Sequence, residues 1–253
     1  MTMTLYTDLE PYCCEVLRAR VADGGLPPGD VWERDICTLT AAELAPYRQV
    51  HLFCGIGGSP LGLKWAGWPA ELSIVTGGFP CQDISVGGGG EGITGSRSGL
   101  WKEMARVIDA IRPDYAIVEN SPALTSRGLG TVLGDLAEIG YDAEWHCIDA
   151  ASVGAPHRRE RIWIVAYPMC DRASRLEPVA HPCHDRSWWP SGEEDLQSIG
   201  ERPYERGNRW PQPLIRRVDD GLSARVDRLH ALGNAQVPAV VALLARAILA
   251  RVK

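Results

Sequence analysis

The chain has 253 residues, of which 45% are hydrophobic and 23% charged, a composition typical of an ordinary globular domain. The polar first residues exclude a signal peptide, and the longest apolar run, which Arg246 interrupts, is too short to span a bilayer. Eight cysteines without a C-x-x-C pair argue against a disulfide framework and predict reduced thiols. We therefore expect a cytoplasmic monomer with no membrane contact.

The formal net charge of −6 is unevenly distributed along the chain. Residues 1–150 hold 10 Lys and Arg against 20 Asp and Glu, a balance of −10, whereas residues 151–253 hold 16 against 12, a balance of +4. Most of the positive charges in the second part are arginines, which bind phosphates and base edges well. A nucleic-acid partner is one explanation, and an arginine-rich composition from a GC-rich genome is the other.

Apolar strands alternate with amphipathic helices along most of the chain, which predicts an α/β fold with a parallel sheet. We expect strands at residues 5–8, 30–36, 49–53, 71–80, 114–120, 143–150 and 161–166, and helices at residues 10–25, 41–47, 60–68, 98–111, 131–140 and 235–252. Residues 167–220 break this pattern with several prolines and with Trp188, Trp189 and Trp210. This predicts a main domain of residues 1–166 plus 221–253 and a small region of residues 167–220.

A glycine-rich turn follows the strand at residues 49–53. The sequence HLFCGIGG at residues 51–58 runs from that strand into a helix, an arrangement typical of nucleotide-like cofactor sites. Such sites usually place an acid about 20 residues further on, where it binds a ribose, but Val75, Thr76 and Gly77 occupy that place. If this turn binds a ribose-bearing cofactor, the acid must come from elsewhere in the chain.

Cys81 lies in the sequence TGGFPCQDIS at residues 76–85, directly after an apolar strand. The carboxyl end of such a strand is the edge where open α/β sheets bind ligands. A cysteine is more often a small buried hydrophobic residue than a nucleophile. Here Pro80, Gln82 and the glycine-rich loop at residues 85–98 favour an exposed nucleophile.

Three further motifs lie at strand ends or turns. Glu119 ends a buried strand, where a lone carboxylate is costly and a raised pKa would make it a proton donor. Arg159 and Arg161 lie on the same side of a strand start and can reach one site, although alone they would suggest a solvated basic face. The sequence ALGNAQVP at residues 231–238 begins the last helix. Each motif is weak alone, and their combination is specific.

Together these motifs resemble those of the DNA (cytosine-5) methyltransferase family. The family's glycine, nucleophile, acid, arginine and Gly-Asn motifs correspond to residues 53–58, 80–82, 119–121, 157–161 and 233–238. Two positions depart from the family pattern: Ser121 replaces a usual valine and His157 a usual glutamine. The resemblance covers nearly the whole chain except residues 167–220. It implies the Rossmann-like sheet of a class I methyltransferase, S-adenosyl-L-methionine as cofactor and double-stranded DNA as partner.

The resemblance also implies a mechanism for methylating C5 of cytosine in DNA. The Cys81 thiolate adds to C6 of a base that is flipped out of the duplex, and C5 then takes the methyl group. Protonated Glu119 hydrogen-bonds N3 of the base, while Arg159 and Arg161 stabilise its O2 side and the thiolate. Residues 86–98 would close over the flipped base as a lid.

For the cofactor, the resemblance implies that the acid motif has moved ahead of the glycine turn. Residues 7–12 resemble the segment whose acid binds the ribose, which assigns Asp8 to the ribose and Leu9 to the adenine face. Residues 33–36 resemble the next motif, in which Asp35 binds the adenine amino group. A helix N-cap is the alternative role of Asp8. The expected cofactor pocket consists of Asp8, Leu9, Asp35, Ile36, Phe53, Gly55, Ile56, Gly57, Gly58, Pro80, Leu100 and Asn234.

The permuted motif order makes a prediction about the sheet. The glycine strand should lie between the strand of Asp8 and the strand that precedes Cys81. The helix at residues 60–68 then leads to the opposite neighbour from the usual one, so a right-handed crossover could place it on the other face of the sheet. The sequence leaves that face undetermined.

Two other functions stay open at this point: an RNA cytosine-5 methyltransferase and a non-catalytic DNA-binding relative. We expect no metal, because Cys170, His181, Cys183 and His184 fit no standard zinc spacing. Residues 167–220 occupy the place of the family's target-recognition region, and their small number predicts a short or loosely defined target. The compact size favours an enzyme of a phage or mobile element.

Overall fold

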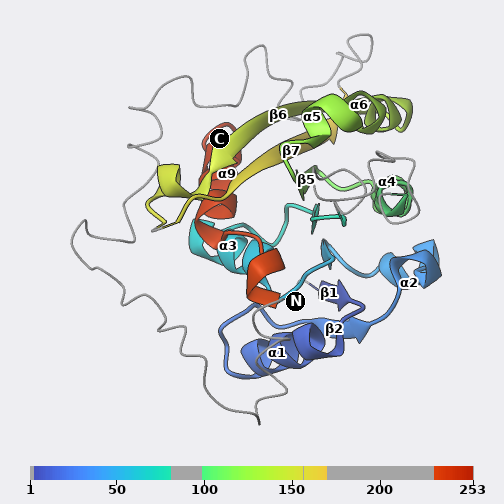
Figure 1. The fold of residues 1–253 in the computed structure, drawn as a ribbon. Helices are drawn as coiled ribbons and strands as arrows, with labels where there is room; N and C mark the ends of the chain where they lie inside the picture. Colours follow the sequence, from blue (N-terminus) through green and yellow to red (C-terminus); the bar gives the residue numbers. More distant parts are fainter. Residues whose placement is uncertain (1–2, 81–98, 156, 170–230, 253) are drawn as a thin grey trace.

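The computed structural model describes residues 3–80, 99–155, 157–169 and 231–252. Within them, seven strands form one sheet in the order β2-β1-β3-β4-β5-β7-β6 (Figure 1). β3 thus lies between β1 and β4, which is the neighbour relation expected from the sequence. The strands are β1 (Thr4–Asp8), β2 (Asp30–Glu33), β3 (Gln49–Leu52), β4 (Ile74–Gly77), β5 (Tyr115–Asn120), β6 (Tyr141–Asp149) and β7 (Glu160–Pro168).

Helices cover both faces of this sheet, so the described residues form three layers (Figure 1). One face carries α1, α3 and α9, and the other carries α2, α4 and α6. In β4, Ile74 packs toward α9 while its neighbour Val75 packs toward α4, as the alternation of strand side chains requires. The helices are α1 (Pro11–Ala22), α2 (Ala41–Leu44), α3 (Gly58–Ala66), α4 (Leu100–Ile111), α5 (Leu124–Arg127), α6 (Leu129–Glu138) and α9 (Pro238–Leu249), with 3-10 turns η1 (Ile36–Thr38) and η3 (Ala150–Val153).

The sheet differs from the predicted parallel sheet at one edge. β1 to β5 pair in parallel, but β7 pairs antiparallel with both β5 and β6. The connection from β6 to β7 holds only η3 and a short turn, and a parallel pair needs a longer crossover of about a dozen residues. The expectation of a parallel sheet was therefore wrong for β7, which runs opposite to both of its neighbours.

The β3-α3-β4 unit has an unusual hand. The β1-α1-β2 and β4-α4-β5 units step in opposite directions across the sheet and place their helices on opposite faces, so both have the same hand. β3-α3-β4 steps in the same direction as β4-α4-β5, yet α3 lies on the face of α1 and α9. Because nearly all parallel crossovers are right-handed, β3-α3-β4 is a left-handed exception. This answers which face the helix after the glycine turn covers.

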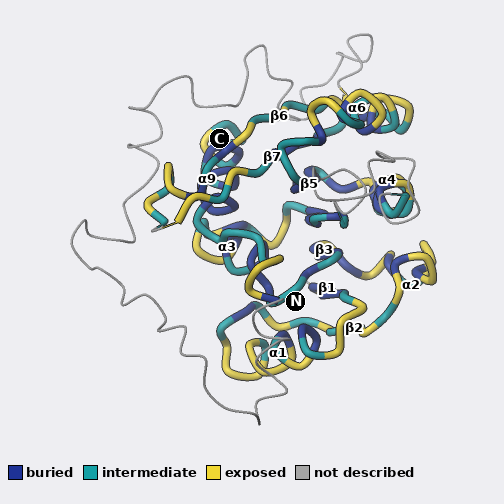
Figure 2. The backbone as a smooth tube through the Cα atoms, in the orientation of Figure 1, coloured by how far each residue is buried: buried dark blue, intermediate teal, exposed yellow. Residues whose placement is uncertain are grey.

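The last helix fills the core beside α3. Eight of the twelve residues of α9 are buried against α3 and the sheet, so it is dark blue along most of its length in Figure 2. The segment Ala231–Leu249 is long and apolar enough to cross a membrane by length and composition, contrary to our expectation from the apolar run alone. Core helices of folded domains pass the same test, and the packing of α9 accounts for its apolar character.

Candidate active site

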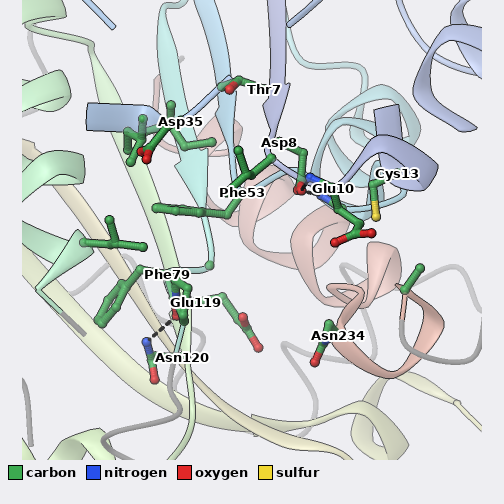
Figure 3. A pocket seen from close by; sticks show the side chains of 18 of the residues that line it. Thr7, Asp8, Glu10, Cys13, Asp35, Phe53, Phe79, Glu119, Asn120 and Asn234 are labelled. Carbon is green, nitrogen blue, oxygen red and sulfur yellow. Dashed lines mark hydrogen bonds between the residues drawn. The ribbon is translucent and has the colours of Figure 1, made fainter. Parts of the chain in front are cut away.

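A cavity of about 400 Å³ opens at the carboxyl ends of β1, β3, β4 and β5. Figure 3 shows side chains from these strands pointing into it, together with Asn234 from the turn before α9. The volume lies within the range of small-molecule sites. Of the residues predicted from the sequence, the cavity gathers Asp8, Leu9, Asp35, Ile36, Phe53, Gly55, Pro80, Leu100, Glu119, Arg159, Arg161 and Asn234.

Asp8 connects the end of β1 to the glycine turn. Its Oδ2 accepts a hydrogen bond of 2.7 Å from the backbone N–H of Gly55, and its Oδ1 accepts one of 2.9 Å from that of Glu10. Asp8 is therefore not the side-chain N-cap of α1: the cap position is Glu10, two residues later, and the Oδ1 bond is to the cap's own N–H. The carboxylate lies at the wall of the cavity, where each oxygen keeps a further lone pair.

The glycine turn has a strained backbone. Phe53 has φ of +47°, a left-handed conformation that costs a residue with a side chain roughly 1–2 kcal/mol. Gly55 follows with φ of +54°, and no atom lies within 4 Å of the place where its Cβ would be. The strained turn directs the Phe53 ring into the cavity, while Gly55 leaves its backbone open to a ligand (Figure 3).

Apolar groups line the cavity near Asp35. Leu9 is 66% exposed at the mouth, whereas Ile36 is 5% exposed. Asp35 caps η1 by accepting a hydrogen bond of 2.9 Å from the Cys37 N–H. Arg106 of α4 fixes the same loop, because its guanidinium donates to the carbonyl oxygens of Ile36 at 2.9 Å and of Leu39 at 2.8 Å. This part of the cavity offers flat apolar contact beside carboxylate acceptors.

Glu119 lies at the other end of the cavity and is only 7% exposed. Burial raises the pKa of its carboxyl group, while Arg161 and Arg159 oppose the rise. Oε1 lies 3.0 Å from Nε of Arg161, an ion pair rather than a well-aligned hydrogen bond, since Oε1 has no hydrogen-bond partner among the described residues. Oε2 reaches the backbone of Gly78, where a Cβ would lie 2.6 Å from it. A larger residue than glycine there would displace the carboxyl group.

Asn120 supports the segment that leads to the predicted nucleophile. It is 2% exposed, and its Nδ2 donates a hydrogen bond of 3.0 Å to the carbonyl oxygen of Phe79 (Figure 3). Phe79 packs against Trp101 of α4, with ring centroids 5.6 Å apart. Pro80 follows in the cavity wall. Cys81 and the predicted lid at residues 86–98 lie outside the described residues.

Arg159 and Arg161 come together as predicted, and both line two cavities. The second cavity, of about 870 Å³, lies between α3, η3 and the turn before α9. Nη1 of Arg159 donates to the carbonyl oxygen of Gly233 at 2.6 Å, which joins the arginine motif to the Gly-Asn motif. His157 lines only the second cavity.

Three residues predicted for the cofactor pocket lie elsewhere: Ile56, Gly57 and Gly58 line the second cavity instead. After Gly55 the chain turns away into α3, and Gly57 caps that helix in a left-handed conformation with φ of +88°. Gly58 packs against the turn before α9, where a Cβ would overlap the carbonyl group of Gln236. These two glycines allow the close packing of α3. Their assignment to the cofactor stays a prediction.

The sequence did not predict three residues that support the site: Asn120 as a structural anchor, Arg106 and Gln236. Asn120 and Gln236 both stood inside recognised motifs, but the roles of Gln236 and Arg106 depend on contacts that bring distant segments together. The spacing of residues along the sequence could not have revealed these contacts. Among the described residues, no group of three or more His, Cys, Asp or Glu side chains could hold a metal ion. Cys170, His181, Cys183 and His184 lie outside those residues.

Comparison with known proteins finds relatives in sequence and in structure. Type II methyltransferase M2.BsuMI of Bacillus subtilis is 33% identical over 223 residues, covering 71% of this chain and 57% of that protein. Type II methyltransferase M.CviJI of Paramecium bursaria Chlorella virus IL3A is 32% identical over 100 residues, covering 39% and 27%. The solved structure of S. pombe Dnmt2 methyltransferase is 14% identical with a TM-score of 0.41, covering 68% of this chain and 52% of that one. This chain spans little more than half the length of M2.BsuMI.

A family model matches the central part of the chain, residues 67–182, and its description is C-5 cytosine-specific DNA methylase. That segment includes β4, β5 and β7, with the positions of Cys81, Glu119, Arg159 and Arg161. The family match and the two curated relatives agree with each other. Residues 67–182 are therefore similar to the C-5 cytosine-specific DNA methylase family.

Proposed function

We propose that this protein transfers a methyl group from S-adenosyl-L-methionine to C5 of cytosine in double-stranded DNA. The observation that carries the proposal is the position of Glu119 and Arg161, which face one another 3.0 Å apart at one end of the cavity, within the segment that matches the family model. At the other end of the same cavity lie Asp8, Asp35 and Phe53, which suit an adenosine group. One cavity would therefore hold the methyl donor beside the target base.

The cavity fits S-adenosyl-L-methionine, which would supply the methyl group as a positively charged sulfonium. Leu9 and Phe53 offer apolar surface for the adenine ring, and the exposure of Leu9 leaves that surface open. Asp8 would accept hydrogen bonds from the ribose hydroxyls, and Asp35 one from the adenine amino group. The open space at Gly55 allows the ligand to approach the backbone closely.

The proposed chemistry is covalent catalysis on a flipped-out base. The sulfur of Cys81 forms a bond to C6, and the electron pair of the C5–C6 double bond becomes available at C5. C5 then accepts the methyl group, with S-adenosyl-L-homocysteine as the leaving group. Loss of the C5 proton to water re-forms the double bond as the C6–sulfur bond breaks and releases the Cys81 thiolate. The step is redox-neutral, since the methyl group replaces a proton.

Glu119 would supply the electrostatic help that this addition needs. Its pKa is raised by burial, which favours the protonated carboxyl group that can hydrogen-bond N3 of the base. Arg161 and Arg159 would stabilise the charge that develops toward O2. Arg161 contacts Glu119 directly, so the acid and the cation are positioned by a single contact.

We also propose that the order of the cofactor motifs is permuted, with the segments of Asp8 and Asp35 placed ahead of the glycine turn. The left-handed β3-α3-β4 unit supports this idea. If α3 led to β1 rather than to β4, it would step in the other direction and the crossover would be right-handed. The chain order, rather than the position of the helix, is then the unusual feature.

Three further parts of the proposal concern the whole protein. Residues 167–220 would form the small target-recognition region, beside a catalytic domain of residues 1–166 plus 221–253, with a short or loosely defined target. The enzyme would act as a monomer in the cytoplasm. The named relatives are type II methyltransferases, one of them viral, which supports a restriction-modification or phage setting.

Transfer of labelled methyl groups tests the proposed function. The purified chain, incubated with labelled S-adenosyl-L-methionine, should label plasmid DNA but not tRNA. The Cys81→Ser variant should abolish labelling, and Glu119→Gln should lower kcat by roughly 10²- to 10⁴-fold. Label in tRNA alone would support the RNA alternative instead.

Trapping and sequencing complete the test. DNA that contains 5-fluorocytosine should form a covalent complex with the protein, and absence of the complex would favour a non-catalytic relative. Bisulfite sequencing of plasmid from expressing cells should show methylation at a short motif. Methylation confined to a six-base motif would contradict the short-target part of the proposal.

A further inference from the structure

A polar bridge crosses the floor of the site from α3 to the end of β5. The hydroxyl group of Ser59, in the first turn of α3, donates a hydrogen bond to Oε1 of Gln236, which lies just before α9. On its other side, the Gln236 amide lies near Glu119. The three residues come from segments far apart in the chain, and no motif in the sequence connects them.

The position of the Gln236 amide is set by close backbone contacts. The carbonyl group of Gln236 packs against Gly58, where a Cβ would lie 2.9 Å from the carbonyl carbon. A Cβ added to Gly78 would lie 3.0 Å from Nε2 of Gln236 and 2.6 Å from Oε2 of Glu119. The side-chain amide and the carboxyl group therefore lie near the same point. Two glycines thus make room for the amide beside the carboxyl group.

Ser59 also determines which way the amide faces. Because Oε1 of Gln236 accepts from the Ser59 hydroxyl, the amide NH₂ is directed to the opposite side, toward Glu119. Nε2 is buried and has no well-aligned hydrogen-bond acceptor among the described residues. A buried amide N–H without an acceptor is costly, so a small movement of the carboxyl group that completes this hydrogen bond would be favourable.

We propose that Gln236, oriented by Ser59, is a positioning residue that holds the Glu119 carboxyl group in place and favours its ionised form. The inference rests on the proposed function, in which Glu119 is the acid that hydrogen-bonds the target base. The groups that face Glu119 among the described residues are Arg161 and Arg159, on β7 and its approach, and Gln236 from the turn before α9. Burial raises the pKa of Glu119, and the two arginines and the Gln236 amide each lower it.

The bridge has a chemical consequence. An enzyme whose acid must be protonated loses activity at a pH above the pKa of that acid. If the pKa rises too far, the acid holds its proton too tightly to share it with the target base. By limiting the rise in pKa that burial causes, Gln236 would keep the pKa of Glu119 close to the pH at which the enzyme works. Arg161 acts on Oε1 and Gln236 on Oε2, so the two oxygens would have separate partners.

The decisive measurement is the titration of Glu119 itself. The whole chain is labelled with ¹³C at glutamate carboxyl groups, and the Glu119 signal is assigned by its absence in Glu119→Gln. In Gln236→Leu, which removes the donor at similar volume, the midpoint of the Glu119 titration should rise by roughly half to one pH unit. Val237→Ala, in the same turn, is the matched control and should leave it unchanged. An unchanged midpoint in Gln236→Leu would overturn the inference.

Ser59→Ala provides a second variant. It leaves the amide in place but removes the bond that orients it, so a smaller rise of the Glu119 midpoint is expected. If Gln236→Leu fails to fold, this variant decides: a rise supports the inference, and no change refutes it. Thermal unfolding and binding of S-adenosyl-L-methionine show whether either variant disturbs the site in general.

The catalytic readout is separate from the titration. If DNA methylation is confirmed, the alkaline limb of the kcat/KM profile should move to higher pH in Gln236→Leu, and not in Val237→Ala. If no methyl transfer is found, the proposed function fails, while the titration still decides whether Gln236 controls Glu119.

Discussion

At the scale of single residues, the site depends on side chains that do more than one task. Asp8 uses one carboxylate to fix the glycine turn and to face the cavity. Glu119 combines burial with two neighbouring cations. Phe53 accepts a strained backbone that places its ring in the cavity. Such strain is retained only where surrounding structure imposes it, and it concentrates at functional sites.

Replacing Asp8 by Asn should weaken binding of S-adenosyl-L-methionine at least tenfold. The amide cannot accept from both the Gly55 and Glu10 N–H groups while also binding a ribose, and an unmet hydrogen bond at the part-buried Gly55 N–H costs about 1–3 kcal/mol. Isothermal titration calorimetry measures the effect. Glu33→Gln, which changes the acid at the end of the neighbouring strand β2 outside the cavity, is the control. Equal affinities of Asp8→Asn and wild type would refute the ribose assignment.

The Glu119→Gln variant should be more stable than wild type at neutral pH. Because burial raises the native pKa of Glu119 above its ordinary value of 4.5, the folded state binds its proton more tightly than the unfolded state. Wild-type stability therefore falls as pH rises from about 4.5 through the native pKa, and a neutral glutamine avoids that loss.

Urea unfolding at pH 4.5 and at pH 8 tests this prediction. The difference in unfolding free energy between Glu119→Gln and wild type should grow in favour of the variant with pH. Glu138→Gln, at an exposed position, provides the comparison. A difference that shrinks with pH would show that the ion pair with Arg161 outweighs the cost of burial.

At the scale of elements, glycines allow α3 and α9 to pack closely. A Cβ on Gly62 would overlap the Pro238 carbonyl oxygen and lie 2.6 Å from Cβ of Val241. These neighbours are backbone or the stem of a side chain in a buried helix, so they have little room to move. The same contact fixes the turn that carries Gln236 and Asn234, so helix packing and site geometry depend on each other.

Alanine substitutions at two helix glycines should change stability in opposite directions. Gly62→Ala should destabilise the protein by about 1–3 kcal/mol or more, because it overpacks the α3–α9 contact. Gly134→Ala in α6 should stabilise it by roughly 0.5–1 kcal/mol, since nothing lies within 4 Å of the new Cβ and alanine favours helix. Chemical unfolding of both variants measures the contrast, and equal effects would contradict the packing argument.

At the scale of the molecule, the strand order is compatible with the proposed permutation of the chain. The carboxyl ends of β1, β3, β4 and β5 meet at the same edge regardless of the order in which the chain visits them. The connection that differs from the usual right-handed crossover is the left-handed β3-α3-β4 unit.

A rearranged chain should therefore fold to the same structure. The order would be residues 48–69, a linker, residues 3–47, a second linker and residues 70–253, so that α3 leads to β1 and β2 leads through α2 to β4. We expect binding of S-adenosyl-L-methionine within about threefold of wild type and a melting temperature within a few degrees. The control carries the same linkers at these junctions without reordering, and loss of folding in the rearranged chain alone would argue against the permutation.

The residue pattern was sufficient to predict most elements and the ends at which the site forms. Apolar runs predicted the seven strands, and Asp8, Glu119 and Arg161 lie at the strand ends or starts that meet at the site. The pattern did not reveal that β6 and β7 form an antiparallel pair, although the short connection between them was a usable signal. It also did not reveal that Ile56, Gly57 and Gly58 line the second cavity, because a glycine required for helix packing and one required for a ligand look the same in a sequence.

Only the folded chain could show which face of the sheet α3 covers and that Gln236 contacts Ser59. Each results from packing between segments far apart in sequence, and the bridge joins residues 177 positions apart. Local propensity and periodicity report which face of an element is apolar, but they carry no information about which distant face will cover it. That choice depends on the fit of whole elements against each other, since a buried interface forms only where shape and hydrogen bonding match on both sides.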